Sequence, residues 1–262
     1  MSRAEWIGLV CLPAALLISF LDVGLSFIPL GLFILACIVL PFFPQSSFFL
    51  PVICRGSSGK KAVALTFDDG PDPLSTPELL DLLSKHGVKA TFFVTGKRAL
   101  ANPDLMKKIL SQGHGLGNHT YSHDCLFALR STKRMLQEIE STQNILRGFG
   151  IRCLAFRPPV GITSPRLRKS MRQMDGMVIG FSCRALDRGN RCVSGLAKKI
   201  LDRVRPDDII LLHDIGPKDH SIRSLWFEEV ESLLSGLKEK ELTVLALSAL
   251  IGRPIMMRDE NS

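Results

Sequence analysis

Residues 62–73, "AVALTFDDGPDP", place two adjacent carboxylates and a Gly-Pro turn directly after an apolar run. The apolar run has the length and composition of a buried strand. Asp68 and Asp69 follow it side by side, and withdrawing two anions from water costs several kcal/mol per ion unless a cation compensates them. The stretch therefore predicts a strand whose carboxyl end carries a site for positive charge.

The first 53 residues have the composition of a membrane anchor. Between Ile7 and Ile53 the only formal charge is Asp22, which separates two apolar segments, 7–21 and 23–40. A spanning helix needs about 20 apolar residues, so this run predicts two short transmembrane helices, or one span with an interfacial segment. A cleaved signal peptide, the alternative, has an apolar core of only about 7 to 15 residues.

The remaining residues, 54–262, suit one domain, because single α/β barrels commonly reach about 200 residues or more. Short apolar runs alternate there with amphipathic stretches. We predict strands at 62–67, 89–95, 115–118, 153–157, 176–182, 208–213 and 242–247. Alternating strands and helices imply a parallel sheet or barrel, whose ligands gather at the carboxyl ends of the strands.

The stretch "STPELLDLLSKHG", residues 75–87, shows how one of the intervening helices is delimited. Thr76 can cap its amino end, Pro77 suits the first helical position and Gly87 can terminate it.

Charge and cysteine content limit the partners. The chain has a formal net charge of +8, and only three charged residues lie in the first 53, so the excess belongs to the domain. Such an excess favours anionic lipid headgroups or phosphorylated substrates, although a solvated basic surface explains it equally well. The sequence contains no basic stripe interleaved with aromatic residues, the pattern that would indicate nucleic-acid binding. The seven cysteines form no C-x-x-C pair, and their odd, scattered set fits a reducing compartment.

"GNHTYSHD", residues 117–124, contains the first candidate cation site. His119 and His123 are four residues apart, so one helical turn would place both imidazoles on one face. With one carboxylate of the Asp68-Asp69 pair, three protein ligands would leave positions open for water, as in a catalytic metal site. A His-x-x-x-His pair on its own is more often structural than metal-binding.

Two further clusters strengthen the metal-site interpretation. "FRPPVG" puts Arg157 at a strand end before two prolines, and "IILLHD" puts His213 at another strand end after an apolar run. Taken singly, Arg157 suggests an ordinary ion pair and His213 a hydrogen-bonded core histidine. Their combination and order are specific.

Five motifs in this order resemble the successive signatures of the polysaccharide deacetylase family, the NodB-homology domain of the family 4 carbohydrate esterases. They are "TFDDGPDP" (66–73), "KATFFVTG" (89–96), "GHGLGNHTYSH" (113–123), "FRPPVG" (156–161) and "ILLHD" (210–214). The resemblance covers roughly Lys61 to Leu250. It implies a distorted (β/α) barrel of the NodB-homology type, preceded here by the predicted N-terminal transmembrane helices.

The resemblance also implies a cofactor. Asp69, His119 and His123 would hold a divalent metal ion, for which zinc is the expected element, and Asp68 would be the general base. One carboxylate would then be neutralised by the metal while its neighbour remains able to take a proton. The metal would polarise an acetyl carbonyl and lower the pKa of its bound water, from which Asp68 removes the proton.

Other roles follow from the same resemblance. Arg157 would favour the ionised form of Asp68, and His213 would protonate the departing amine. Val160 would contribute a backbone N–H to the developing oxyanion, and Leu211 would pack on the acetyl methyl group.

The segment "RALDR", residues 184–188, departs from the family pattern of two acids followed by a tryptophan. Arg184 replaces the first acid and Arg188 the tryptophan, whereas Asp187 remains as the acid expected to support the catalytic histidine. Val160 also replaces a common aromatic residue. These changes concern the substrate more than the reaction. The guanidinium groups of Arg184 and Arg188 suit a phosphate-bearing substrate, although a solvent-facing pair explains them equally well.

We therefore expect a membrane-anchored, metal-dependent N-deacetylase of an N-acetylated amino-sugar glycan. Three alternatives remain: a deformylase or other amidase on a lipid-linked sugar, a deacetylase of exported envelope polysaccharide or peptidoglycan, and an inactive glycan-binding relative.

The charges around the anchor predict its orientation. If the two apolar segments form a hairpin, both of its ends lie on one side of the inner or plasma membrane. Arg3 precedes the first segment, and Arg55, Lys60 and Lys61 follow the second, which favours the cytoplasmic side. The short spacer 44–51 would keep the domain at the bilayer, which favours a phospholipid-linked glycan. A single span would instead place the domain outside.

Overall fold

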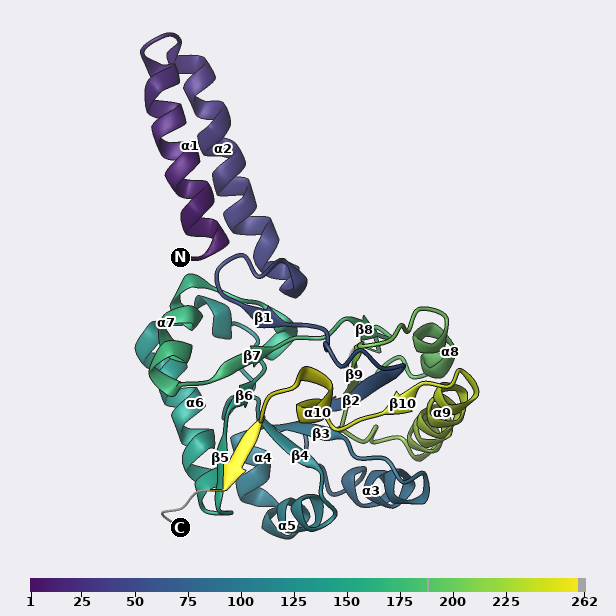
Figure 1. The fold of residues 1–262 in the computed structure, drawn as a ribbon. Coiled ribbons are helices and arrows are strands. Elements are labelled where there is room, and N and C mark those ends of the chain that lie inside the picture. The colour runs from purple at the N-terminus through teal and green to yellow at the C-terminus, as the bar shows by residue number, and fades with distance from the viewer. Residues whose placement is uncertain (188, 259–262) are drawn as a thin grey trace.

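The computed structural model describes residues 1–187 and 189–258, which form a helical hairpin and a barrel-like domain (Figure 1). The strands are β1 (Val52–Ile53), β2 (Ala62–Asp68), β3 (Thr91–Val94), β4 (Gly115–Asn118), β5 (Ile151–Cys153), β6 (Ala155–Phe156), β7 (Met177–Ile179), β8 (Cys183–Arg184), β9 (Ile209–His213), β10 (Thr243–Val244) and β11 (Met256–Arg258). The α-helices are α1 (Arg3–Ser19), α2 (Val23–Val39), α3 (Thr76–Lys85), α4 (Gly96–Ala101), α5 (Pro103–Ser111), α6 (Thr132–Arg147), α7 (Pro165–Met174), α8 (Leu196–Leu201), α9 (His220–Glu239) and α10 (Leu247–Ile251). Short 3₁₀ turns are η1 (Leu40–Phe42), η2 (Pro44–Ser46), η3 (Phe127–Leu129) and η4 (Pro159–Gly161).

The main sheet confirms the predicted barrel of parallel strands. Its order is β1-β7-β6-β4-β3-β2-β9-β8, and β10 pairs with β2 beside this path. Each of these pairings is parallel. The carboxyl ends of the strands therefore meet at one edge of the curved sheet, with helices outside it (Figure 1).

Two predicted strands and one predicted helix cap were wrong in detail. The expected strand 153–157 is two strands, because β5 leaves the barrel to pair antiparallel with β11 while β6 stays in the main sheet. The expected strand 242–247 is only the two residues of β10, since α10 begins at Leu247. Ser75, not Thr76, occupies the N-cap position of α3. The Thr76 hydroxyl is instead engaged with a buried carboxylate described below.

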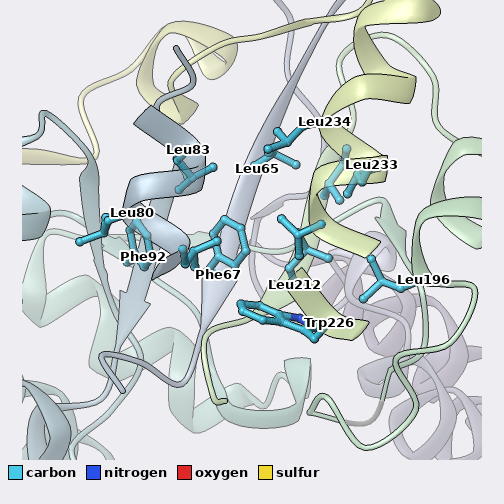
Figure 2. Close-up of a cluster of buried hydrophobic side chains, with 14 of the residues drawn as sticks. Leu65, Phe67, Leu80, Leu83, Phe92, Leu196, Leu212, Trp226, Leu233 and Leu234 are labelled. Carbon is cyan, nitrogen blue, oxygen red and sulfur yellow. The ribbon is translucent and has the colours of Figure 1, made fainter. Parts of the chain in front are cut away.

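Alternation along β2 separates the packed core from the barrel interior. Val63, Leu65 and Phe67 belong to the large cluster under the helices, whereas Ala62 and Ala64 belong to a second cluster. Figure 2 shows the large cluster, with side chains from β2, β3 and β9 packed against α3, α8 and α9. Because successive strand residues point to opposite faces, Thr66 and Asp68 share the face of the small alanines.

The N-terminal hairpin consists of α1 and α2, which run antiparallel and project from the barrel (Figure 1). The first helix begins at Arg3, four residues before the predicted start, because Ser2 and Glu5 form a capping box. Small residues of α1, Ala4, Gly8 and Ala15, are buried, which fits close approach of two helices.

One helix in the described part of the chain is long and apolar enough to cross a membrane. It is α2 continued by η1, residues 23–42, with a mean hydropathy of 2.6 and 6% of its window buried. The 17 residues of α1 rise only about 25 Å, less than the hydrocarbon core of about 30 Å. A second span at 7–21 therefore stays a prediction.

The base of the hairpin packs on the barrel beside the loops that follow β4 and β6. Phe48 and Phe49 share an apolar cluster with Phe127 of η3 and Phe156 of β6. The Thr163 backbone N–H, just after η4, donates to the carbonyl of Pro41 in η1 at 3.5 Å. The hairpin therefore touches loops on the carboxyl-end side of the sheet.

Candidate active site

The register of β2 and β9 places two predicted catalytic residues beside each other. Asp68 is paired with His213 and Thr66 with Leu211, on adjacent parallel strands. The Asp214 backbone N–H donates to the carbonyl of Asp68 at 2.8 Å, which ties the two strand ends together. Asp68 and His213 therefore lie at the same level of the barrel.

Arg157 follows β6 and crosses the barrel interior to Asp68. Its Nη1 lies 2.6 Å from Asp68 Oδ1 and 2.9 Å from Thr66 Oγ1, and the side chain of Arg157 is 1% exposed. Its remaining donors reach the carbonyls of Ile179 and Gly180. Because every nitrogen of the guanidinium has a partner, the ion pair fixes one oxygen of Asp68 in position.

Asp69, His119 and His123 form the cluster that could hold a metal ion. Asp69 Oδ1 lies 3.4 Å from Nε2 of His119 and 3.1 Å from Nε2 of His123. The candidate ligand atoms of all three residues lie within 4.8 Å of one another. The successive carboxylates thus diverge, with Asp68 directed to Arg157 and Asp69 to the histidines.

Two features show that these residues fit a divalent cation. Asp69 Oδ1 is buried and accepts no hydrogen bond from the described residues. The Nδ1 atom of His119 lies 2.7 Å from the carbonyl of Arg157, so Nδ1 carries the proton and donates it. The lone pair of Nε2 is then directed at the unsatisfied carboxylate oxygen. Nitrogen and oxygen donors with this spacing suit Zn²⁺.

The expected helical turn between the two histidines was wrong. His119 and His123 lie in an irregular loop after β4, although their rings are still 4.9 Å apart between centroids. Glu138 of α6 holds this loop, because it accepts hydrogen bonds from the backbone and hydroxyl of Ser122 at 2.8 and 2.9 Å. Tertiary contacts, not helix geometry, bring the imidazoles together.

Backbone strain gathers around the same cluster. Residues with positive φ that are not glycine occur in both loops that contribute to it: Asp69 (74°), Thr120 (66°) and His123 (54°). The neighbouring loops that carry Arg157 and Asp187 each add one more, Val160 (58°) and Leu186 (59°). Each such conformation costs on the order of 1 to 3 kcal/mol and persists only where the surroundings impose it. These conformations lower the stability of the folded chain but direct the side chains of the site toward one another.

His213 and Asp187 form a second hydrogen-bonded pair. His213 Nδ1 lies 2.8 Å from Asp187 Oδ2, and Asp187 is buried. Burial opposes a charge on His213. The hydrogen bond to Asp187 and the negative charges of Asp187, Asp68 and Asp69 outweigh that effect and raise the pKa of the imidazole above its ordinary value. With Nδ1 held by Asp187, Nε2 is the nitrogen left for a reacting group.

The predicted substrate-binding residues lie around this site. Leu211 is two residues before His213 on β9 and is 7% exposed, while Val160 of η4 is 60% exposed. Arg184 of β8 is paired with Leu211, and its guanidinium carbon lies 5.2 Å from the centroid of the Phe181 ring. The prediction for Arg188 lies outside the described residues.

Three residues that the sequence analysis did not select complete the site. Thr66 shares the inner face with Asp68 and was detectable from strand alternation. Asn190 donates from Nδ2 to the carbonyls of His213 and Ile215, at 2.8 and 2.9 Å, and so holds the Asp187 loop against β9. No sequence spacing marks Asn190, because its partners are more than 20 residues away.

Asp214, the third, is a fully buried carboxyl beside the loop that follows β2. It accepts hydrogen bonds from Ser75 Oγ at 2.9 Å and from Thr76 Oγ1 at 2.6 Å. A side chain at Gly70 would collide with it. Burial raises the pKa of Asp214 to about 7, with Asp72 adding to the effect and the two hydroxyls opposing it.

Comparison with known proteins identifies similar chains. Residues 55–179 match the family model described as polysaccharide deacetylase. A peptidoglycan-N-acetylglucosamine deacetylase of Bacillus cereus is 32% identical over 197 residues, which cover 74% of this chain and 90% of the relative. A chitooligosaccharide deacetylase of Sinorhizobium fredii is 33% identical over 204 residues, or 78% of this chain and 90% of the relative.

A solved structure shows the same fold. A crystal structure of the Bc1960 peptidoglycan N-acetylglucosamine deacetylase superposes with a TM-score of 0.70 at 32% identity. The match covers 78% of this chain and 94% of that one.

The metal content of purified variants should distinguish the residues that bind the ion from residues that only lie beside it. We expect the purified full chain to hold about one zinc-like ion, and His119→Ala or His123→Ala to lose it, because each removes one of three donors. Asp68→Asn is the matched control, since it alters a buried residue of the same site that is not a ligand. Elemental analysis of the purified variants provides the measurement, and full occupancy in the His119→Ala/His123→Ala double variant would refute the ligand assignment.

Asp214 should make stability depend on pH. Its pKa is about 7 in the folded chain and near 3.8 when unfolded, so between these values the folded state holds a proton that the unfolded state lacks. Stability contributed by this group therefore falls as pH rises from about 4 to 7, by about 4 kcal/mol in total.

Asp214→Asn cannot titrate and should flatten that slope in urea unfolding of the full chain at a series of pH values. An amide also fits the geometry, because it can accept from Thr76 and donate to Ser75. Asp219→Asn, at an exposed helix cap, is the control. Parallel curves for wild type and Asp214→Asn would show that Asp214 is ionised at every pH tested.

Proposed function

Because the chain belongs to the polysaccharide deacetylase family, we propose that it removes the N-acetyl group from an N-acetylglucosamine-type sugar with the help of a divalent metal ion, zinc being the ion we expect. Family membership makes it a hydrolase of carbon–nitrogen bonds other than peptide bonds. One observation supports the proposal most: the Asp69, His119 and His123 cluster lies between a carboxylate held by Arg157 and an imidazole held by Asp187.

Asp68 has the position of a general base. A divalent ion at the cluster would polarise the acetyl carbonyl and make nearby water more acidic. Asp68 Oδ1 is committed to Arg157, whereas Oδ2 lies 3.7 Å from His119 Nε2 and so faces the cluster. Oδ2 is therefore the atom that would accept the proton of the attacking water.

His213 has the position of the general acid. Asp187 orients the ring and raises its pKa, so Nε2 can carry a proton toward the sugar nitrogen. The amine leaves with that proton, and acetate is the second product. Leu211, on the same strand face as His213, would contact the acetyl methyl group, and the Val160 backbone N–H would stabilise the oxyanion.

We further propose that the substrate is a lipid-linked glycan. The supporting contacts are those between the hairpin and the loops on the catalytic side of the barrel, where Thr163 meets Pro41 and Phe127 shares a cluster with Phe48. A hairpin in the bilayer would therefore hold the catalytic loops near the headgroups, where a membrane-bound sugar is presented.

Arg184 fits such a substrate. Its guanidinium stacks near Phe181 at the edge of the site, beside Leu211, and forms no ion pair with a described residue. A phosphate that joins the sugar to its lipid would be a suitable partner.

An exported envelope-glycan deacetylase is the second candidate. The relatives named above as peptidoglycan and chitooligosaccharide deacetylases support it. The charges on either side of the hairpin in the sequence support the first candidate, since Arg3 precedes it and Arg55, Lys60 and Lys61 follow it, a pattern that favours the cytoplasmic side of the inner or plasma membrane.

A substrate panel tests the proposal. The full chain in detergent should release acetate from a lipid-diphosphate-linked N-acetylated sugar faster than from a neutral chitooligosaccharide or from peptidoglycan. Mass spectrometry of the released acid would identify a deformylase by formate. Release from the peptidoglycan alone would favour the exported enzyme, and no release from any acylated amino sugar would refute hydrolysis.

Replacement of the proposed general base should slow hydrolysis strongly without loss of the metal. We expect Asp68→Asn to reduce the turnover rate by roughly 10² to 10⁴, the usual contribution of a general acid or base. Asp202→Asn, on the exposed end of α8, is the control for expression and handling. A rate for Asp68→Asn close to that of wild type would mean that another group takes the proton.

Native cysteines can decide the side of the membrane. Cys125 and Cys192 are exposed on the domain, so a cytoplasmic domain should resist a membrane-impermeant maleimide in intact cells and react after permeabilisation. The Cys125→Ser/Cys192→Ser variant measures the background labelling of the hairpin cysteines, Cys11 and Cys37. Labelling of the wild type in intact cells would place the barrel outside and favour the exported enzyme.

A further inference from the structure

A groove between the hairpin and α7 has walls of opposite character. It encloses about 940 Å³. One wall is apolar and comes from α1 and α2, with Leu9, Leu12 and Phe33, while the other comes from α7 and is cationic, with Lys169 and Arg172. None of the catalytic residues contributes to it. The groove is therefore a feature of the hairpin base, separate from the candidate active site.

The cationic wall keeps two charges without protein partners. Arg168, also in this wall, is committed to Glu5 of α1 through an ion pair of 2.5 Å, which fixes α7 against the hairpin. Lys169 and Arg172 are exposed and form no ion pair or hydrogen bond with any residue of the described chain. Two free cations one helical turn apart can contact one phosphate group.

The apolar wall continues onto the outside of the hairpin. Leu9 and Leu12 are 55% and 54% exposed, which is the environment of a lipid chain if the hairpin lies in a bilayer. Along the groove, polarity thus changes from hydrocarbon at α1 to positive charge at α7. A phospholipid has the same order, with acyl chains joined to a phosphate.

We propose that this groove binds one anionic glycerophospholipid, with an acyl chain against Leu9, Leu12 and Phe33 and the phosphate at Lys169 and Arg172. The inference rests on the hairpin lying in the membrane, as proposed above. Free phosphate lacks the apolar half of the ligand and matches only one wall. The bound lipid would fix the depth of α7, and hence the height of the adjoining catalytic loop, at the headgroup level.

The test uses the full chain in nanodiscs or detergent supplied with phosphatidylglycerol and phosphatidylcholine, and native mass spectrometry to count bound lipid. Wild type should retain one phosphatidylglycerol in preference to phosphatidylcholine. The Lys169→Gln/Arg172→Gln variant should bind it roughly thirtyfold more weakly, because each nearby cation contributes about fivefold and the two factors multiply. Lys238→Gln/Lys240→Gln removes two exposed charges from the far end of α9 and should behave as wild type.

Other outcomes separate this inference from the proposed function. Equal retention of both lipids by wild type, or undiminished phosphatidylglycerol binding by the α7 variant, would overturn the site. Displacement by inorganic phosphate at the same concentration that free phosphatidylglycerol requires would also overturn it, since the acyl contacts would then contribute nothing. The α7 variant should hydrolyse a soluble chitooligosaccharide at the wild-type rate. Loss of lipid binding without loss of this activity would show that the groove is separate from the catalytic site.

Discussion

The ion pair between Arg157 and Asp68 is the constraint on which the rest of the site depends. Both groups are buried, and a buried pair is stable only when its remaining donors and acceptors are satisfied. Thr66 and the carbonyls of Ile179 and Gly180 provide those partners, so the pair joins β2 to β6 and β7 across the barrel. Loss of the arginine would leave an unpaired buried carboxylate, at a cost of about 3 to 5 kcal/mol.

Glycines in the motifs make room for this arrangement. The Arg157 guanidinium lies 4.0 Å from the centroid of the Phe93 ring, a contact worth about 2 kcal/mol where water is excluded. A side chain at Gly117 would collide with that ring. At Gly70, the absence of a side chain lets the loop after Asp69 pass Asp214. Motif residues without chemistry of their own thus determine where the reactive groups lie.

The sequence predicted the strand ends well, because an apolar run that stops at Asp68, Asn118 or His213 reports burial and its limit locally. It predicted the wrong geometry for His119 and His123, since their spacing also fits a loop folded by Ser122 and Glu138. Asp214 and Asn190 escaped notice for a related reason. Their partners come from other strands and loops, and only the folded barrel brings them within hydrogen-bonding distance.

The contacts of the hairpin with the barrel bear on which substrates can reach the candidate active site. A barrel that ends at the strand-end loops can act on any glycan that diffuses to it, but here Pro41 touches the loop after Val160, and Phe48 packs with Phe127. Any tilt of the hairpin relative to the barrel would disturb those buried contacts. If the hairpin lies in a membrane, as proposed, its position there and access to the strand-end loops are coupled through one apolar cluster, and this coupling would favour substrates delivered in the plane of the bilayer.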